Sequence, residues 1–421
     1  QNQMSILDKA SLIQIPSGYK STKLYSLRPI NGDGDFTFAR SSSATRVNSE
    51  GLIETASVVS TTELVTNGDF ATDSDWTIES TWTISGGAAN GNGASGSTQE
   101  LKQTSVNTIG KIYKATFEVL NYVSGTVGFW QGSGISVIPR SANGTYTEYF
   151  TATSTEIRFR GTNFYGSIDN VSVKEVIEND VPRLDYSGGA SCASLLLEPQ
   201  RTNLITYSED FSQWTATDLA VTDNNATSPD GILNASKLTA VSGTSTKRIA
   251  LGSMPTSSAT RSFSIFVKTD DIKAIQLLHS GDLQGYANFD LSNNIVGITG
   301  SKTTSKIEDY GNGWFRCTAI FDNTNSSGST LYLYIKDNAL GTYGGNTSEV
   351  GDLFIYGSQY EQGSYPTSYI ISNSGSQTTR TADVCNNAGT SATFNDSEGV
   401  LFAEISAFAD DGTARRIYIN N

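Results

Sequence analysis

Two stretches of the sequence open in the same way, TELVTNGDFATDSDW at residues 62–76 and TNLITYSEDFSQW at residues 202–214. Both read Thr, a polar residue, Leu, an aliphatic residue and Thr, followed by a polar loop, Asp-Phe and a Trp. Strand-like sequence follows each stretch and ends on a related string, FYGSIDNVSVKEV at 164–176 or FIYGSQYEQGS at 354–364. A repeat of this length is too long for a solenoid, so it indicates a tandem of whole domains.

The sequence inside these two modules has a dominant period of two. Apolar and polar side chains alternate in IYKATFEVL at 112–120, in RSFSIFVKTD at 261–270 and in LYLYIKD at 331–337. Such alternation places one face of a strand on a core and leaves the other outside. The 40 Gly residues and frequent Asn and Asp supply turns between short strands. We therefore predict an all-β chain of tandem antiparallel β-sandwiches, with domains at residues 62–180 and 181–385.

Both ends of the chain contain strand-like strings that are too short to form a core alone. Residues 1–61 include ILDKASLIQIPSGYK and the alternating string DFTFARSSSATRVNSEGLIE, and residues 386–421 contain two or three further strings. The unpaired backbone groups at a strand edge tend to form hydrogen bonds with another strand. We therefore expect residues 1–61 to form a strand-rich assembly or anchoring segment that packs against another chain, and residues 386–421 to be an incomplete third β domain.

The charge balance limits the class of partner. Twenty-eight Lys and Arg side chains stand against 42 Asp and Glu side chains, which gives a formal net charge of −14. A chain this acidic lacks the phosphate-neutralising surface of a nucleic-acid-binding protein. No apolar run approaches the length of a bilayer span. We therefore expect neither nucleic acid as a partner nor insertion into a membrane.

The residue spacing shows no catalytic constellation. His279 is the single histidine, so a hydrolytic triad or a histidine proton shuttle would have to include it. No G-x-S-x-G nucleophile elbow accompanies it, and a catalytic zinc site usually contains several histidines. The sequence therefore predicts a protein that is not an enzyme and requires no cofactor.

The opening and closing strings of the first module resemble a known family. NGDF followed by Trp at residues 67–76, together with IDNVSV at residues 168–173, resembles the jelly-roll carbohydrate-binding modules found beside glycoside hydrolases. This resemblance implies jelly-roll topology for the sandwiches and a carbohydrate-binding role.

The same resemblance implies a structural calcium ion, which often joins the opening strand to the closing strand in those modules. The matching residues here are Asp69 and Asp169, whose carboxylates suit a hard cation. The second module has Asp210 but has Gln359 and Tyr360 in place of the closing Asp-Asn, which departs from that pattern.

A second resemblance covers most of the chain. The strings that carry it, in chain order, are MSILDKASLIQIPSGYK, FTFARSSSATRVNSEGLIE, VPRLDY, LLLEPQRTNLITYSEDFSQW, YEQGSYPTSYI and TTRTAD. Together they resemble a widespread group of bacteriophage virion proteins, mostly fibre, spike or appendage components. EGVLFAEISAF near the C-terminus looks like the first strands of a concanavalin-like sandwich, which such proteins often carry next. The resemblance implies a protein on the surface of the phage particle, with capsid or tail proteins as partners, and a homo-oligomer for which a trimer is favoured.

Outward aromatic side chains are the candidates for sugar binding, because sugar rings stack on aromatic faces. The period of two turns Phe129 inward and Trp130 outward in TVGFWQGSG, and it turns Tyr332 and Tyr334 outward in LYLYIKD. Trp and Tyr are also enriched in subunit interfaces, so burial against a second chain is the alternative for these residues. The other tryptophans are expected in the cores: Trp76, Trp82, Trp214 and Trp314.

We therefore expect a non-enzymatic virion structural protein, a fibre or fibre-anchoring appendage, that presents β-sandwich modules for assembly and for attachment to a host surface glycan. One alternative is a polysaccharide depolymerase whose catalytic domain lies beyond Asn421, and another is a bacterial cell-surface adhesin. A long parallel β-helix beyond Asn421 would favour the depolymerase, and a sorting or secretion domain would favour the adhesin.

Overall fold

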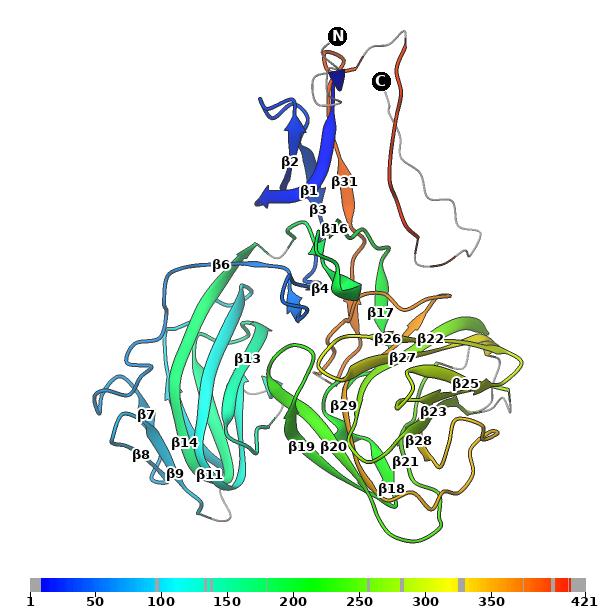
Figure 1. The fold of residues 1–421 in the computed structure, drawn as a ribbon. Coiled ribbons are helices and arrows are strands. Elements are labelled where there is room, and N and C mark those ends of the chain that lie inside the picture. Colours follow the sequence, from blue (N-terminus) through cyan, green and yellow to red (C-terminus); the bar gives the residue numbers. More distant parts are fainter. Residues whose placement is uncertain are drawn as a thin grey trace.

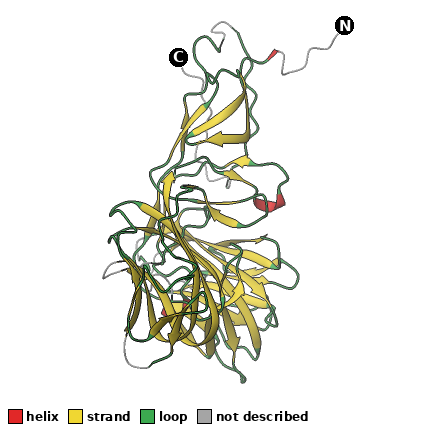
Figure 2. Cartoon of the chain, turned by 90° about the vertical axis from the view of Figure 1, so that its left-hand side faces the viewer, coloured by secondary structure: helices red, strands yellow, loops and turns green. Residues whose placement is uncertain are grey.

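The computed structural model describes residues 9–94, 98–131, 135–136, 139–178, 180–255, 258–280, 284–324, 330–373, 375–394, 398–407 and 409. These residues form strands and loops almost throughout, with short 3-10 turns at η1 (Ser187–Gly189) and η2 (Phe211–Gln213) (Figure 2). The strand pairs are antiparallel, so the predicted all-β class with antiparallel sandwiches is confirmed. The jelly-roll connectivity stays a prediction. No helix in this part of the chain is long and apolar enough to cross a membrane.

A small sheet, which we call the base sheet, stands at one end of the molecule, beyond the two sandwiches (Figures 1 and 2). Its strands, in spatial order, are β1 (Ile13–Lys20), β2 (Lys23–Arg28), β3 (Phe36–Ala39) and β31 (Val384–Asn386). β31 comes from the far end of the chain and places Cys385 opposite Phe38. The end of the predicted 181–385 domain thus belongs to the N-terminal sheet, because β3 otherwise leaves an unpaired edge.

The first sandwich is built around one long ribbon of two strands. Its strands are β6 (Val58–Val59), β7 (Thr77–Ile78), β8 (Trp82–Ile84), β9 (Ala89–Asn92), β10 (Thr98–Gln103), β11 (Ile112–Gln131), β12 (Ile135–Ser136), β13 (Gly144–Thr151) and β14 (Ile157–Glu178). β11 and β14 pair along their lengths, and the register shifts between Leu120 and Thr126. The rings of Phe117 and Phe129, both on β11, lie 6.3 Å apart. The ribbon therefore bends back, and its two halves face each other across the core.

Gly125 makes that bend sterically feasible. Its φ angle is +77°, and a Cβ atom at this position would lie 2.1 Å from the carbonyl oxygen of Asn163. Glycine is the residue that tolerates both the left-handed conformation and the close backbone approach.

The second sandwich consists of two six-stranded sheets. One contains, in spatial order, β18 (Thr215–Thr217), β21 (Arg248–Leu251), β28 (Leu331–Lys336), β23 (Ala274–His279), β24 (Tyr286–Asp290) and β25 (Ile295–Thr299). The other contains β19 (Leu219–Thr227), β20 (Leu233–Ala240), β29 (Gly351–Gln362), β22 (Ala259–Thr269), β27 (Trp314–Thr324) and β26 (Thr303–Asp309). Two short ladders lie in the stretches that flank the second sandwich, β15 (Leu184–Asp185) with β16 (Ser194–Leu195) and β17 (Arg201–Asn203) with β30 (Thr378–Arg380).

Part of the N-terminal segment packs on this second sandwich. The hairpin of β4 (Thr45–Val47) and β5 (Ile53–Thr55) places Val47 and Ile53 in a cluster with Phe266 and Tyr356. Phe266 alternates with core residues and points outward, yet it is buried, because the hairpin covers it. Residues 1–61 thus find a partner partly within their own chain, and packing against another chain stays a prediction.

The alternation read from the sequence gives the correct core residues. The inward positions of the three quoted strands are all buried, as are the four tryptophans expected in the cores: Tyr113, Ala115, Phe117, Val119, Phe263, Ile265, Val267, Leu331, Leu333, Ile335, Trp76, Trp82, Trp214 and Trp314. These predictions are confirmed.

The two repeated opening stretches make the same contacts. The indole N–H of Trp76 donates to the carbonyl oxygen of Asn67 at 3.0 Å, and that of Trp214 donates to the carbonyl oxygen of Tyr207 at 3.1 Å. Each indole ring also contacts the Phe of its own Asp-Phe pair, with ring centroids 5.2 Å and 5.4 Å apart. The sequence repeat is therefore a repeat of one local structure.

The closing strands repeat as well. Val171 donates its backbone N–H to the carbonyl oxygen of Gly68 at 2.8 Å, and Ser358 donates to that of Ser208 at 2.8 Å. Each opening loop is thereby fastened to the closing strand of its own module.

The hydrogen bonds of Val171 and Ser358 correct one detail of the comparison between the two closing strings. They make residues 356–357 the structural equivalents of Asp169-Asn170, whereas the sequence strings place residues 359–360 there. Asn170 and Gly357 both have positive φ angles, 49° and 55°, where the register shifts at a β-bulge. A bulge needs a residue that accepts this conformation, so its position sets the equivalence.

The segment after β31 has a different form from the one expected. Residues 387–394 and 398–407 contain no strand, and the apolar side chains of Val400, Leu401 and Phe402 are exposed. The expected strands of residues 408 and 410–421 lie outside the described residues. The concanavalin-like domain stays a prediction.

The paired indole hydrogen bonds give a stability test. We expect Trp76→Phe and Trp214→Phe each to lower the free energy of unfolding by about 1–3 kcal/mol, because a carbonyl loses its donor and the smaller ring leaves space. Urea unfolding followed by circular dichroism measures the change. Trp130→Phe on the outer surface is the matched control and should cost about 0.5 kcal/mol or less. Equal costs for all three variants would contradict the role of the paired indoles.

Candidate functional site

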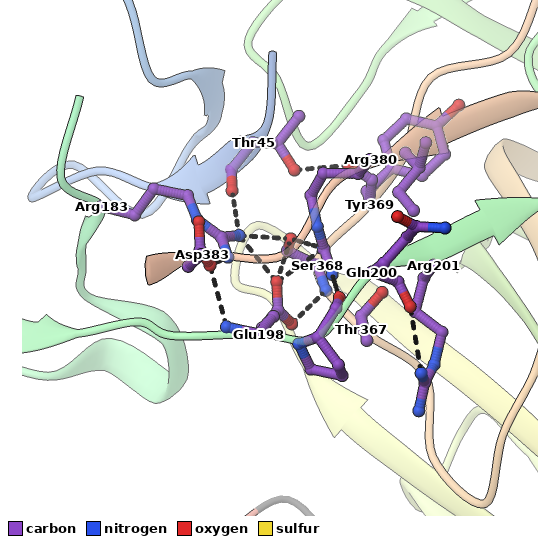
Figure 3. Close-up of polar contacts among 12 residues, drawn as sticks. Thr45, Arg183, Glu198, Gln200, Arg201, Thr367, Ser368, Tyr369, Arg380 and Asp383 are labelled. Carbon is purple, nitrogen blue, oxygen red and sulfur yellow. Dashed lines mark hydrogen bonds and ion pairs between the residues drawn. The ribbon is translucent and has the colours of Figure 1, made fainter. Parts of the chain in front are cut away.

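A buried cluster of charged side chains lies where the base sheet, the linker between the modules and the second sandwich meet (Figure 3). We call it the junction network, and its members are Arg40, Thr45, Arg183, Glu198, Ser368, Arg380 and Asp383. They come from the start of the chain, the stretch between β14 and β17, the loop after β29 and the stretch around β30. The ion-paired side chains are at most 1% exposed.

Glu198 is the central acceptor of the network. Its Oε2 atom accepts from Nη1 of Arg183 at 2.7 Å, from Nη1 of Arg380 at 2.6 Å and from the hydroxyl of Ser368 at 2.7 Å. Its Oε1 atom accepts from the backbone N–H of Ser368 at 2.8 Å. Burial opposes the charged form of the carboxyl, yet Arg380 and Arg183 hold the pKa of Glu198 below its ordinary value. Glu198 is therefore ionised at neutral pH.

Asp383, near the end of the chain, links Arg40, near its start, to Arg183 and Glu198. It pairs with Nη1 of Arg40 at 3.0 Å and with Nη2 of Arg183, and it accepts the backbone N–H of Glu198 at 2.8 Å. Arg183 also donates to the carbonyl oxygen of Thr45 at 3.1 Å. With its acceptors occupied and solvent excluded, the network is suited to fastening segments together rather than to binding a substrate.

Sequence reasoning did not find this network, although its members lie in strings that carry the virion-protein resemblance. Arg183 lies in VPRLDY, Glu198 in LLLEPQ, and Arg380 and Asp383 in TTRTAD. The sequence does contain one signal: each of these charged residues stands among apolar and turn residues. Such a position indicates that the charge is buried, and a buried charge requires an ion-pair partner.

Trp130 faces away from the first core, as predicted. Phe129 is buried beside it, and Trp130 is half-buried. The guanidinium of Arg160 lies 4.2 Å from the centroid of the Trp130 ring and is held by Glu100 at 2.6 Å. One face of the indole thus carries a cation. Sugar binding at Trp130 stays a prediction.

Tyr332 and Tyr334 point away from the second core, on the central strand β28, with ring centroids 5.5 Å apart. Arg248 lies 4.7 Å from the Tyr332 ring centroid and donates to the hydroxyl of Tyr334 at 2.7 Å. Tyr332 is half-buried, but Tyr334 is only 5% exposed.

The cover over Tyr334 comes from the loop after β28. Gln276 donates to the carbonyl oxygen of Thr342 at 2.9 Å and accepts the N–H of Gly344 at 2.7 Å. A small cluster around Tyr334 is completed by Leu278, Tyr286 and Tyr343. The alternation in LYLYIKD thus predicts the outward direction of Tyr334 correctly. It cannot show that a loop folds back over that face.

The calcium residues Asp69 and Asp169 lie on segments that the Gly68–Val171 hydrogen bond brings together. Asp69 accepts the backbone N–H of Ala71 at 3.4 Å, and Asp169 accepts that of Asn170 at 2.7 Å. Among the residues that the structure describes, no group of three or more His, Cys, Asp or Glu side chains is arranged to hold a metal ion. The calcium ion therefore stays a prediction.

The comparisons with known proteins give no family. Neither a protein-family model nor a curated protein sequence matches the chain. Among solved structures, the N-terminal CBM22-1–CBM22-2 tandem domain of Xyn10C from Paenibacillus barcinonensis is 10% identical and covers 73% of this chain and 99% of its own, with a TM-score of 0.24. An anti-sigma factor domain-containing protein is 8% identical and covers 59% and 82%, with a TM-score of 0.14. At such TM-scores neither likeness carries an argument.

The junction network gives the first prediction from this site. Glu198→Gln leaves Arg380 buried without the carboxylate it pairs with and leaves Arg183 with that of Asp383 alone. Breaking a buried ion pair costs about 3–5 kcal/mol of unfolding free energy. Urea unfolding measures this loss. Glu54→Gln is the matched control, since Glu54 pairs with Arg46 at the surface and should cost about 1 kcal/mol or less. A Glu198→Gln variant as stable as Glu54→Gln would show that the network does not hold the fold.

A second buried carboxylate responds to pH. Glu209, in the second opening stretch, accepts from the hydroxyls of Tyr356 and Tyr369 at 3.0 Å each and from Asn373 at 2.9 Å. Burial, with a further contribution from Asp230, raises the pKa of Glu209 to about 7.

Because the folded pKa of Glu209 lies above the unfolded value, the folded state holds a proton that the unfolded state has lost between about pH 4.5 and pH 7. This group therefore lowers the free energy of unfolding as pH rises through that window, by at most about 3 kcal/mol. Urea unfolding at pH 5 and pH 7.5 should show a smaller fall for Glu209→Gln than for the unmodified chain. Glu54→Gln should retain the full fall, and an unchanged fall in Glu209→Gln would contradict the assignment.

Proposed function

We propose that this chain is a non-catalytic structural subunit of a phage virion, a fibre or fibre-anchoring appendage, which presents two β-sandwich modules for assembly and for attachment to a host surface glycan. The observation that carries the proposal is the junction network. Strings spread over most of the sequence carry the resemblance to virion appendage proteins, and side chains from several of them meet at this one buried site. A network of this kind would hold the second sandwich at a fixed position relative to the base sheet.

The base sheet supports the assembly part of the proposal. Ile15, Tyr25, Leu27 and Val384, all on this small sheet, are each more than 40% exposed. Exposed apolar side chains on a sheet favour association with another chain. Capsid or tail proteins and two further copies of this chain, in a homotrimer, are the partners we propose.

The outer surfaces support the attachment part. Trp130 and Tyr332 are half-buried, each beside an arginine that leaves part of the ring accessible.

His279, the single histidine, is completely buried against Phe321 and Tyr360, which supports a role in packing rather than in catalysis.

The test uses the phage that encodes this chain. We expect mass spectrometry to find the chain in purified particles, light scattering to give about three times the 45.0 kDa chain mass, and the purified chain to compete with phage adsorption to host cells. Trp130→Ala and Tyr332→Ala should each weaken that competition several-fold and leave the unfolding midpoint and the oligomer unchanged.

Three results would contradict the proposal. Absence of the chain from particles, with display on a bacterial surface, would favour an adhesin. Release of reducing ends from host polysaccharide, abolished by one Asp or Glu substitution, would favour an enzyme. Dissociation of the oligomer in Trp130→Ala or Tyr332→Ala would place these residues in a subunit interface.

A further inference from the structure

The first sandwich carries two lysines directly opposite each other on the outer face of its long ribbon. Lys114 on β11 pairs in register with Lys174 on β14, and the inward neighbours Ala115 and Val173 are completely buried. Side chains opposite each other in an antiparallel pair have Cβ atoms about 5 Å apart, and like charges there destabilise the pair. Among the described ion pairs, Lys111 is joined to Glu175 at 2.7 Å, but none includes Lys114 or Lys174.

These lysines line a cleft of about 310 Å³. The cleft lies over β11 and β14 and is bordered by the chain after β6. Figure 1 shows these strands in its left-hand sandwich. Its other lining residues are almost all hydroxylic: Val59, Ser60, Thr61, Thr116 and Ser172. Thr116 and Ser172 form the next cross-strand pair beside the lysines.

The described hydrogen bonds of the acidic side chain beside this face are to groups other than the two lysines. Glu63 contacts Ser172, but its carboxylate also accepts the backbone N–H groups of Leu64 at 3.0 Å and Val173 at 2.8 Å. Tyr149 on β13 lies opposite Lys114, whose Nζ atom is 5.9 Å from the ring centroid. Tyr149, Lys114 and Lys174 thus form a row across three strands, beside the hydroxyls of Thr116 and Ser172. The two cations stand in a protein whose net charge is −14.

The second module provides an internal comparison. The shared bulge register makes Ser262 and Glu361 the equivalents of Lys114 and Lys174. Both are completely buried, and Glu361 accepts the backbone N–H of Thr367 at 2.9 Å, so the loop after β29 covers this face. The same surface is therefore covered by the chain itself in the second module, whereas in the first it carries two half-buried lysines that border a cleft.

We propose that the cleft of Lys114 and Lys174 binds an acidic glycan, with the sugar carboxylate between the two ammonium groups and the sugar hydroxyls on Thr116, Ser172 and the Ser60–Thr61 edge. The bound carboxylate would relieve the repulsion of the two lysines, and hydroxyls can both donate to and accept from a sugar. This inference names the ligand class within the proposed attachment function, but its site is separate from Trp130 and Tyr332.

The test titrates the full chain with oligogalacturonate, with its methyl-esterified neutral form and with inorganic phosphate, by calorimetry. Oligogalacturonate should bind, with affinity that falls as salt rises, and the neutral form should not. Lys114→Gln and Lys174→Gln should each weaken binding at least tenfold without lowering the unfolding midpoint, because each removes one of two repelling charges. Lys306→Gln, which makes the same charge change at a lysine bonded to Glu308 in the second module, is the matched control and should bind as the unmodified chain does.

The contrary outcomes are distinct. No binding of oligogalacturonate or of polysialic acid, a second carboxylated probe, would overturn the proposal, as would unchanged binding in the two lysine variants. Phosphate bound as tightly as the oligosaccharide would show a simple anion site and overturn the glycan assignment. If the chain is present in particles and competes for adsorption while both lysine variants compete equally well, this inference fails and the proposed function stands.

Discussion

Three guanidinium groups and two carboxylates share one solvent-free site, and the way the two ends of the chain meet the second sandwich depends on their mutual pairing. Removing a charge from water costs several kcal/mol, so each of these groups is tolerated only while its partners are in place. Arg40 and Asp383 are 343 residues apart, and Arg183 and Glu198 come from the stretch between the modules. The network can therefore form only when the start of the chain, the linker and the end of the chain are together. This requirement couples the base sheet to the second sandwich.

The two modules share one local design and differ in what covers them. Each closes its opening loop with an indole hydrogen bond, and each fastens that loop to its closing strand through a backbone hydrogen bond beside a bulge at Asn170 or Gly357. In the second module the outer face of β22 and β29 is covered by the β4–β5 hairpin and by the loop after β29. In the first module the side chains at the equivalent positions are half-buried and border a cleft. The two modules therefore differ in what covers this face rather than in their local design, and this difference underlies the proposal that the first module binds a ligand.

The sequence predicted features that lie within a single strand, and it did not predict contacts between segments that are far apart in the chain. The alternation in IYKATFEVL and LYLYIKD reports the two faces of single strands, and the structure confirms the inward residues. The same alternation could not show that Tyr334 lies under a loop held by Gln276. Nor could it show that β31 returns to pair with β3, because nothing near residues 384–386 differs from any short strand string. The lysine pair was hidden for a similar reason, since Lys114 and Lys174 become neighbours only through the register of two strands.

The sequence by itself therefore determined the all-β class, the tandem of two related modules and the inward face of their strands, because turn composition, repetition and a period of two are properties of neighbouring residues. The tertiary structure decided which outward residues stay accessible, which charges are paired and which segments close the base. These depend on contacts between residues far apart in the chain, and the free energy of such contacts comes from burial and pairing that no single stretch contains.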